Sequence, residues 1–558
     1  MRKREEIVSR YDRLFSDSIN YFQTCDQLAP YISPSREGIL SANSQGGRFM
    51  ENTYDSTGLF AAELAAHFVS GVMMSPATEW MHLKFENEEH NKIEEAREWL
   101  EECNDLMLKA FARSNFYSEA AESVLDYIAF GSGSLFREEQ PQSLFRPVKG
   151  FRGFLFSCDR IGRYVIGVGV DGSVDTEIRT FSMTARTAEL KWGSENFPDE
   201  MKKALVNDID KAFPILHSIS PRAVGSIKDL RPTNKEMPYA SVWVEKDSKT
   251  ELFEGGYHEF PASVARYKVV PGELWGRGRG ELAFSDIRTL NTLKEIYLQD
   301  LALKAKPPIM ELSDSVIGER RIIPGGKIVV KSPRTGRVQD VFAPFMTGSN
   351  APDVKDTIQR LQDSIKQIFF VQQILALLEV QKPEMTAYEF AQKLQLLYRL
   401  AGPAYGKLDR DFLAPVVESC FEMMLRRDAF PSPPEVLLET GAVIITYFSN
   451  PLSQAQQQGD VEAMSLAFQD LTPFAQMFPA IMDGWDPDKV FQKVTAIRRV
   501  PAFVTRGQDE VTKVREEREK QIAEEKQAQE MMMLARGGKD VGKMVKDMGG
   551  GAEQQEAV

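Results

Sequence analysis

The sequence has few of the side chains from which metal centres, disulfides and acid–base catalysts are built. Its four cysteines lie far apart with no CxxC spacing, at Cys25, Cys103, Cys158 and Cys420, which argues against a zinc site and a disulfide framework. Its five histidines form no HExxH pair, and none lies beside a GxSxG elbow. We therefore expect no catalytic residue, no metal and no cofactor, and synthesis in a reducing compartment.

A phosphate-binding loop is missing as well. In "PGGKIV", Gly326-Lys327 is followed by Ile328, whereas the pattern GxxxxGK[ST] needs a hydroxyl group at this position to hold magnesium. The proline and the two glycines indicate a hairpin turn instead. "WGRGRGE" is rich in glycine but has no βαβ unit around it, which indicates a flexible corner rather than a nucleotide site. The sequence thus argues against an ATPase. A two-metal nuclease stays open, because its paired carboxylates depend on the fold.

Long apolar runs and a surplus of basic residues are also absent. The most apolar stretch, "LFAAELAAHFVSGVMM", contains Glu63 and His67, and the N-terminus has no signal-peptide core, so we expect no membrane segment. A net charge of −13 argues against a broad basic face that wraps nucleic acid, although DNA can still slide past such a surface. With 42% apolar residues, the 558-residue chain can fill about two to four packed units.

The spacing of apolar residues predicts an α+β fold that is mainly helical. An early stretch has apolar side chains at spacings of three and four with carboxylates opposite, which indicates an amphipathic helix; these residues are Ile93, Ala96, Leu100, Cys103, Met107 and Ala110. From about Phe136 to Val270, short β-rich runs predict a mixed α/β unit. Within it, Asp171-Gly172 supplies the positive φ angles of a tight hairpin turn.

A long helix is predicted over residues 285–306, because the double proline Pro307-Pro308 cannot continue it. Its apolar stripe consists of Ile287, Leu290, Leu293, Tyr297 and Leu301. Ile296, Leu298 and Leu303 lie off that stripe, so this helix needs neighbours on more than one side.

A second long helix follows a small, turn-rich β insertion. It is predicted to start near Pro352-Asp353, where proline suits the first turn and aspartate can cap free amides. Its heptad-like run has Gln372 as the one polar position among Ile358, Leu361, Ile365, Ile368 and Leu375. Two long helices therefore bracket the insertion.

The remainder is also predicted to be largely helical. A third helical stretch follows the two long helices, and Gly402-Pro403 lies inside it and should kink it. The charged stretch 508–536 holds eight acidic and six basic residues and can pair its own charges along a helix. The glycine-rich segment 537–558 is expected to be disordered.

Several stretches, in order along the chain, resemble the head-to-tail connector (portal) proteins of short-tailed bacteriophages. They are "LAPYISPSR", "ENTYDSTGLFAAELAAHFVSGVMMSPATEWMHL", "SNFYSEAAESVLDYIAFGSGSLF", "EGGYHEFPASVARYKVVPGELWGRG", "MTAYEF" and "NPLSQAQQQ". "GRGRGELAF" departs from the family, since many relatives have a tyrosine before the glycine and a proline after the arginine. The resemblance spans most of the chain.

The resemblance implies a portal fold assembled as a ring, usually of twelve subunits, at one capsid vertex. Its parts would be a wing (1–284), stem helix 1 (285–306), a clip (307–351), stem helix 2 (352–372), a channel loop (373–384), a kinked wing helix (385–440), a crown (441–536) and a disordered tail (537–558). DNA would enter through the ring during packaging and leave through it during infection. The protein would be made in the host bacterial cytoplasm and reside in the virion at the head–tail junction.

The resemblance and the charge pattern together give two sets of candidate site residues. Residues expected to face the DNA channel are Lys294, Lys304, Lys306, Lys366, Gln373, Glu379 and Lys382. Residues expected to dock the terminase packaging motor and later a tail adaptor are Arg320, Arg321, Lys327, Lys331, Arg334 and Arg337. In a ring, a lysine that faces the channel in every subunit would form a ring of positive charges. The alternative is that each of these lysines is an ordinary surface residue in contact with water.

The partners expected for such a ring are further copies of the chain, double-stranded DNA, the motor and adaptor, and the major capsid and scaffolding or internal core proteins. Two alternatives stay open. One is a DNA-processing enzyme, either a nuclease or a packaging ATPase, and the other is a generic helical scaffold protein.

Overall fold

The computed structural model describes residues 2–40, 52–87, 90–141, 150–222, 236–307, 309–312, 323–324, 326–330, 342–344, 351–378, 406–435, 437, 444–448, 461, 463–471, 486–498 and 511–527. The chain divides into two compact units. The first consists of Met1–Leu83, Cys103–Pro431 and Ile445–Gln456, and the second of Lys84–Glu102, Ser432–Ile444 and Gln457–Val558. The predicted helix pair belongs to the first unit.

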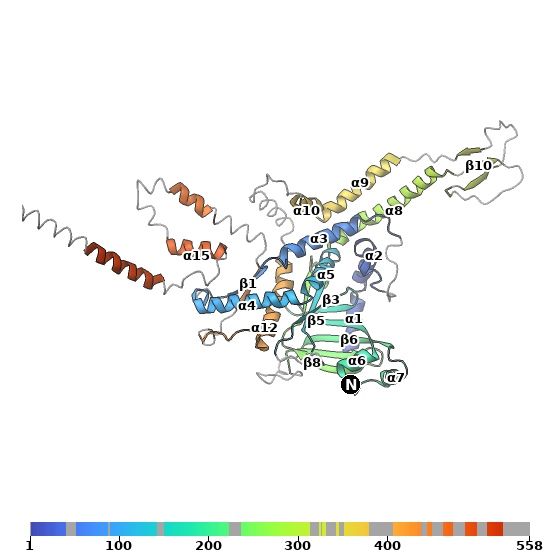
Figure 1. Cartoon of the computed structure of the whole chain (residues 1–558). Helices are drawn as coiled ribbons and strands as arrows, with labels where there is room; N and C mark the ends of the chain where they lie inside the picture. The colour runs from blue at the N-terminus through green and yellow to red at the C-terminus, as the bar shows by residue number, and fades with distance from the viewer. Residues whose placement is uncertain are drawn as a thin grey trace, which may run out of the picture. The chain divides into compact units, whose positions relative to one another are not determined.

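The helical layer of the first unit is built from its N-terminal half (Figure 1). Its elements are α1 (Arg2–Asp17), α2 (Ile19–Ile32), η1 (Pro34–Arg36), α3 (Thr57–Met73) and α5 (Phe116–Ala129). Helix α3 packs against α2 and α5, and small side chains let the neighbours approach; the buried ones are Gly58, Ala61, Ala62, Ala65 and Ala66. The layer forms one wall of the core.

The amphipathic helix predicted from residue 93 is confirmed as α4 (Glu94–Arg113), which follows the short helix η2 (His90–Lys92). Four predicted inward positions are buried, namely Ala96, Leu100, Cys103 and Met107. Ala110 is only half-buried, and Phe111 takes the fully buried position beside it.

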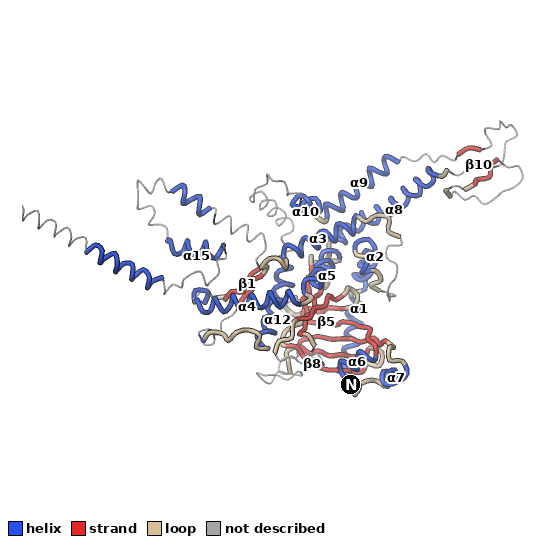
Figure 2. The backbone as a smooth tube through the Cα atoms, in the orientation of Figure 1, coloured by secondary structure: helices blue, strands red, loops and turns tan. Residues whose placement is uncertain are grey.

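Two antiparallel sheets form most of the β part of the first unit (Figure 2). Their strand orders are β4-β5-β6-β7-β8 and β3-β2-β9. The strands are β2 (Ser132–Glu139), β3 (Phe154–Asp159), β4 (Tyr164–Val168), β5 (Val174–Thr184), β6 (Ala212–Pro221), β7 (Tyr239–Glu245), β8 (Thr250–Tyr257) and β9 (Ala262–Arg266). The predicted hairpin is confirmed between β4 and β5, although only Gly172 of its Asp-Gly pair has a positive φ, of 79°.

Two short helices, α6 (Ala185–Trp192) and α7 (Asp199–Asn207), cover one face of the larger sheet. Ala188 and Met201 of these helices are fully buried in one cluster with Ile215 and Trp243 of the strands. Thr184 begins α6 by accepting a hydrogen bond from the Thr187 backbone, which satisfies one free amide of the first turn.

A close backbone crossing fixes the start of the long helix. A Cβ atom on Gly278 would lie 2.5 Å from the backbone nitrogen of Gly131, so neither chain could approach as it does with a side chain there. Trp275 is buried beside the crossing, stacks on Tyr21 at 4.8 Å, and donates a hydrogen bond to Ser18 Oγ at 2.8 Å. The interpretation of "WGRGRGE" as a flexible corner is therefore wrong, because its glycines serve tight packing.

The predicted order of helix, small sheet and helix is confirmed. Helix α8 (Arg279–Ala305) leads to a three-stranded sheet, and α9 (Ala351–Ile368) returns beside α8 (Figure 1). The sheet has the order β11-β10-β12, with β10 (Ile309–Leu312), β11 (Lys327–Val330) and β12 (Phe342–Pro344). Helix α8 starts at Arg279, earlier than the predicted residue 285, because the sequence after Gly278 already supplies helix formers.

The prediction of one continuous second helix is wrong. Helix α9 ends at Ile368, and a separate helix α10 (Val371–Leu378) follows Phe370, which has a φ of 59°. The cause is a contact with Arg279, which donates a hydrogen bond to the Ile368 carbonyl oxygen at 2.6 Å and lies over the Phe370 ring. Residues 373–378, expected to begin a loop, are helical.

The remaining described elements lie towards the C-terminus. A π-helix (Asp409–Leu413) leads into α12 (Ala414–Arg426), and β13 (Ile444–Phe448) pairs with β1 (Met81–Phe85). In the second unit, α15 (Pro487–Arg498) and the helical residues 511–527 are joined by an ion pair between Asp488 and Arg515. The predicted kink at Gly402-Pro403 and the predicted disordered tail lie outside the described residues.

Candidate functional site

The pair of helices α8 and α9 is the part of the first unit that the sequence marks for function. The helices run in opposite directions side by side, and both bury apolar side chains, namely Ile287 and Leu290 of α8 and Ile358 and Ile365 of α9. The two helices are joined by a hydrogen bond of 2.7 Å from Ser364 Oγ to Asp286 Oδ2. The pair is therefore a rigid two-helix rod along its shared length.

Arg279 holds the base of this rod. Its Nε donates to the Tyr267 hydroxyl at 2.6 Å, and its guanidinium carbon lies 3.9 Å from the centre of the Phe370 ring. Arg279 also donates a hydrogen bond to the Ile368 carbonyl oxygen. Its contacts therefore join the end of β9, the start of α8 and the break between α9 and α10. Sequence reasoning missed Arg279, because its partners are remote in the chain.

Asp55 clamps both helices to the body. Its Oδ1 accepts the Thr57 amide at 2.8 Å at the start of α3, while its Oδ2 accepts from Gln362 at 2.8 Å and lies 3.5 Å from the Lys294 ammonium. Burial alone would raise the pKa of Asp55, but the hydrogen bonds from Thr57 and Gln362 outweigh burial and lower it. Asn291 adds a hydrogen bond from the Tyr54 amide at 2.7 Å.

The described candidate lysines of the channel are mostly neutralised within their own chain. Lys294 lies near Asp55, Lys304 pairs with Asp300 at 2.7 Å, and Lys366 lies 3.8 Å from Asp363. Lys306 is exposed at the end of α8, with no ion pair among the described residues.

The other candidates are placed less completely. Gln373 lies on α10 and has a buried side-chain oxygen with no hydrogen bond. Lys327 starts strand β11, whose backbone alone is described. The rest lie outside the described residues: Glu379, Lys382, Arg320, Arg321, Lys331, Arg334 and Arg337.

Apolar side chains on α8 remain exposed in the single subunit. Leu282 is 65% exposed and Ile296 is 52% exposed. Leu298 is 44% exposed and Leu301 is 40% exposed, farther along the helix. A helix that shows this much apolar surface is expected to be covered by another protein surface.

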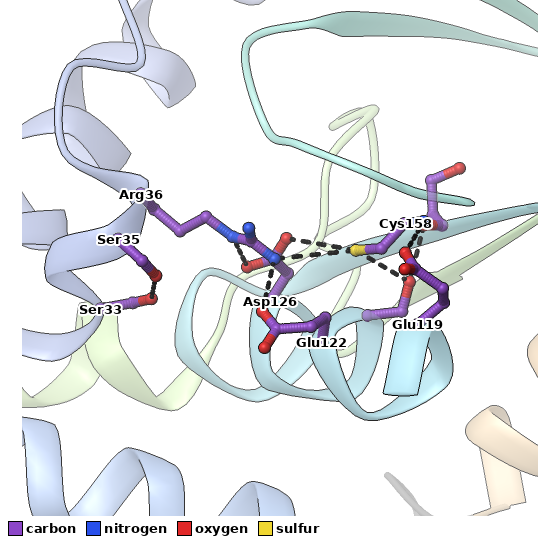
Figure 3. Close-up of polar contacts among 9 residues, drawn as sticks. Ser33, Ser35, Arg36, Glu119, Glu122, Asp126 and Cys158 are labelled. Atoms are coloured by element: carbon purple, nitrogen blue, oxygen red, sulfur yellow. Dashed lines mark hydrogen bonds and ion pairs between the residues drawn. The ribbon is translucent and has the colours of Figure 1, made fainter. Parts of the chain in front are cut away.

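A buried polar cluster lies between α5, β3 and the segment after α2 (Figure 3). Arg36 donates to Asp126 at 2.9 Å and to Glu122 at 3.0 Å, and the Cys158 amide donates to Glu119 at 2.8 Å. Burial raises the pKa of Asp126 to about 6, although Arg36 opposes the shift, and burial raises the pKa of the Cys158 thiol far above neutrality. Burial thus disfavours the thiolate form of Cys158.

A second buried group lies between the two sheets. Arg179 pairs with Asp159 at 2.8 Å, and Ser134 donates to Glu177 at 2.7 Å. His217 stacks on Trp243 at 3.8 Å, and burial holds its pKa well below the usual value. Within the described residues, no group of three acidic, histidine or cysteine side chains is arranged to hold a metal ion.

Membrane insertion has no support in the described helices. None of them combines the length and the apolar composition that crossing a bilayer requires.

Comparison with known proteins matches almost the whole chain. Residues 4–504 match the family model described as bacteriophage head to tail connecting protein. The chain is 25% identical over 525 residues to the portal protein of Salmonella phage epsilon15, covering 93% of this chain and 92% of that protein. It is 24% identical over 550 residues to a probable portal protein of Bordetella phage BPP-1, covering 96% and 94%.

Among solved structures, the neck of a native gene transfer agent particle is similar at a TM-score of 0.33 and 11% identity, over 74% of this chain and 88% of that one.

Proposed function

The chain belongs to the bacteriophage head to tail connecting protein family and has a portal function, and from that premise we propose that its copies close into a ring, of twelve subunits, around a DNA channel. The observation that supports the ring best is the rod of α8 and α9. It is fixed to the body by Asp55 and Arg279, yet its Leu282 and Ile296 side chains are more than half exposed. Rotational assembly covers such a surface without needing a second protein.

The parts of the chain take the roles expected of a portal subunit. Helices α8 and α9 form the stem, the sheet β10–β12 belongs to the clip, and the two antiparallel sheets with the N-terminal helices form the wing. The C-terminal helices form the crown. The assembled ring resides in the virion at the head–tail junction, where it serves capsid assembly, genome packaging, tail attachment and DNA ejection.

The channel transmits DNA without gripping it. Duplex DNA carries about one charge per 1.7 Å, so a continuous basic wall would hold it. In this chain, Lys294, Lys304 and Lys366 each lie near a carboxylate of the same chain, and the net charge is −13. Lys306 is the described candidate that keeps an uncompensated charge, so it is the best candidate for a cationic ring.

The protein is proposed to act without catalysis. The sequence has no phosphate-binding loop, and the buried carboxyl groups Asp126, Asp159 and Glu177 are inaccessible. The purified protein, incubated with duplex DNA, magnesium and ATP, should release no phosphate and leave the DNA intact. DNA cleavage or DNA-stimulated ATP hydrolysis would overturn this part of the proposal.

The clip carries the docking surface for the packaging motor and later for the tail adaptor. Between residues 318 and 337, six basic residues stand against Glu319, which gives a local net charge of about +5 and favours an acidic partner. Reversing Arg334 and Arg337 to glutamate should leave the ring intact and weaken capture of the motor and adaptor in a pull-down. Unchanged capture by intact variant rings would reject this assignment.

A further inference from the structure

The side of α8 that faces away from α9 carries a pair of opposite charges. Asp286 contacts Ser364 of α9, and a helix turns about 100° per residue, so Arg288 points roughly the opposite way. Glu295 lies two turns farther along the same side. Arg288 is exposed and Glu295 is half-buried. We use the term far side of α8 for Arg288 and Glu295.

Lys355 lies on the side of α9 that faces away from α8, because it is nine residues before Ser364, and Asp363 lies at the edge of that side, about 100° from Ser364. Lys355, Gln359 and Asp363 follow one another at intervals of four residues and therefore share a face. A hydrogen bond of 3.2 Å from Gln359 Nε2 to Asp363 Oδ1 confirms their proximity. Lys355 is exposed, and the Asp363 side chain is 49% exposed. These three residues are the far side of α9.

The two far sides match in height along the rod. Asp286 and Ser364 lie level, and the helices run in opposite directions. Moving nine residues along α8 to Glu295 therefore corresponds to moving nine residues back along α9, which reaches Lys355. Arg288 likewise lies within about 1.5 Å of the height of Asp363. A positive charge thus stands level with a negative one at both positions.

We infer that the far side of α8 in one copy packs against the far side of α9 in the next copy, with Arg288 opposite Asp363 and Glu295 opposite Lys355. Rotation about a ring axis parallel to the rod leaves heights unchanged, so the match within one chain becomes a match between neighbours. Neither Arg288 nor Lys355 has an ion-pair partner among the residues that the structure describes. This inference rests on the proposed ring.

Disulfide formation between introduced cysteines tests whether α8 of one copy contacts α9 of the next, and at which height along the rod. Two variants place cysteines at the level positions, Arg288→Cys with Asp363→Cys, and Glu295→Cys with Lys355→Cys. A matched control, Glu295→Cys with Asp363→Cys, uses the same two far sides but offsets the cysteines by about 12 Å along the rod, beyond disulfide reach. All are made in the full-length chain, whose native Cys25, Cys103 and Cys420 are buried and whose half-buried Cys158 is present equally in the level pairs and in the control.

After mild oxidation, denaturing gels should show a ladder of covalent multimers for the two level pairs. The yield should exceed that of the offset control at least about tenfold, because disulfides form only over a short Cα separation. An equal yield in the control, or cross-linked monomers in place of multimers, would overturn the inference. So would intact rings, seen by electron microscopy, that give no ladder.

Charge reversal gives an independent readout in unoxidised protein. Lys355→Glu should lower the fraction of ring in size-exclusion chromatography at low salt, and adding Glu295→Lys should restore it. Failure of the second change to restore rings that the first change had lost would contradict the pairing. Wild-type protein that never forms a ring would instead overturn the proposed function, which separates the two failures.

Discussion

Glu177 is a fully buried carboxyl group; one oxygen accepts a hydrogen bond from Ser134, and the other has no hydrogen-bond partner among the described residues. Burial, aided by the neighbouring Asp159 carboxylate, raises its pKa to about 8. The folded protein therefore holds this proton more tightly than the unfolded chain does. The resulting stability is fully present below about pH 4.5, the unfolded pKa, and it is lost as the pH rises through about 8.

Replacing Glu177 by glutamine should remove this dependence, because the amide keeps the shape and one acceptor oxygen but has no proton to lose. Between pH 5 and pH 9, the unfolding free energy of the variant should rise relative to that of the wild type by at least about 1 kcal/mol, and its melting temperature should rise relative to the wild type accordingly. Thermal unfolding at several pH values measures the gain. The exposed Glu189→Gln serves as the control and should track the wild type; a pH-independent difference for Glu177→Gln would contradict the account.

Residue types in the sequence did not indicate which contacts the side chains make in the fold. The scattered cysteines gave no sign of a reactive thiol, and Cys158 proves to be buried in a polar cluster. The lysines were chosen as channel residues from their positions on the long helices, but Lys294 lies near Asp55, a residue far away in the sequence. Such pairing depends on the fold and leaves no mark in local spacing.

Among the elements, the start of α8 depends on glycine. A Cβ on Gly278 would lie 2.5 Å from the Gly131 nitrogen and 2.7 Å from the Ala129 carbonyl oxygen, both rigid backbone atoms. Because these backbone atoms cannot move at little cost, Gly278→Ala must push the start of α8 away from the segment Ala129–Gly131. We expect a loss of about 2–4 kcal/mol in unfolding free energy, together with fewer assembled rings.

The control for this substitution is Gly71→Ala in α3, where an added Cβ meets nothing within 4 Å. Alanine there should be neutral or stabilising by up to about 1 kcal/mol, because it favours the helical backbone. Denaturant unfolding of both variants measures the contrast. Equal stabilities would show that the crossing at Gly131 does not require glycine.

The elements themselves were largely predictable, whereas their interruptions were not. Apolar spacing at three and four predicted α4, α8 and α9, and the double proline predicted where α8 ends. The same periodicity continues through Phe370, where the helix breaks, because Arg279 takes the carbonyl of Ile368. A local pattern records which side of a helix is buried, but it does not record a hydrogen bond from a remote arginine.

At the scale of the whole molecule, the described part of the chain leaves apolar and charged surface exposed that the proposed assembly would cover. Exposed Leu282 and Ile296 and the matched charges of Arg288 and Asp363 all lie on the rod of α8 and α9. The family membership gives this surface a purpose, since connecting proteins join a phage head to its tail. In the closed ring that we propose, the rod forms the wall.

The most direct test is electron microscopy of the purified full-length protein, viewed down the axis of the particles. The account predicts closed annuli with an open centre wide enough for duplex DNA, and walls in which neighbouring stems pack side by side. Particles that remain single chains under every assembly condition, or discs with a closed centre, would contradict it.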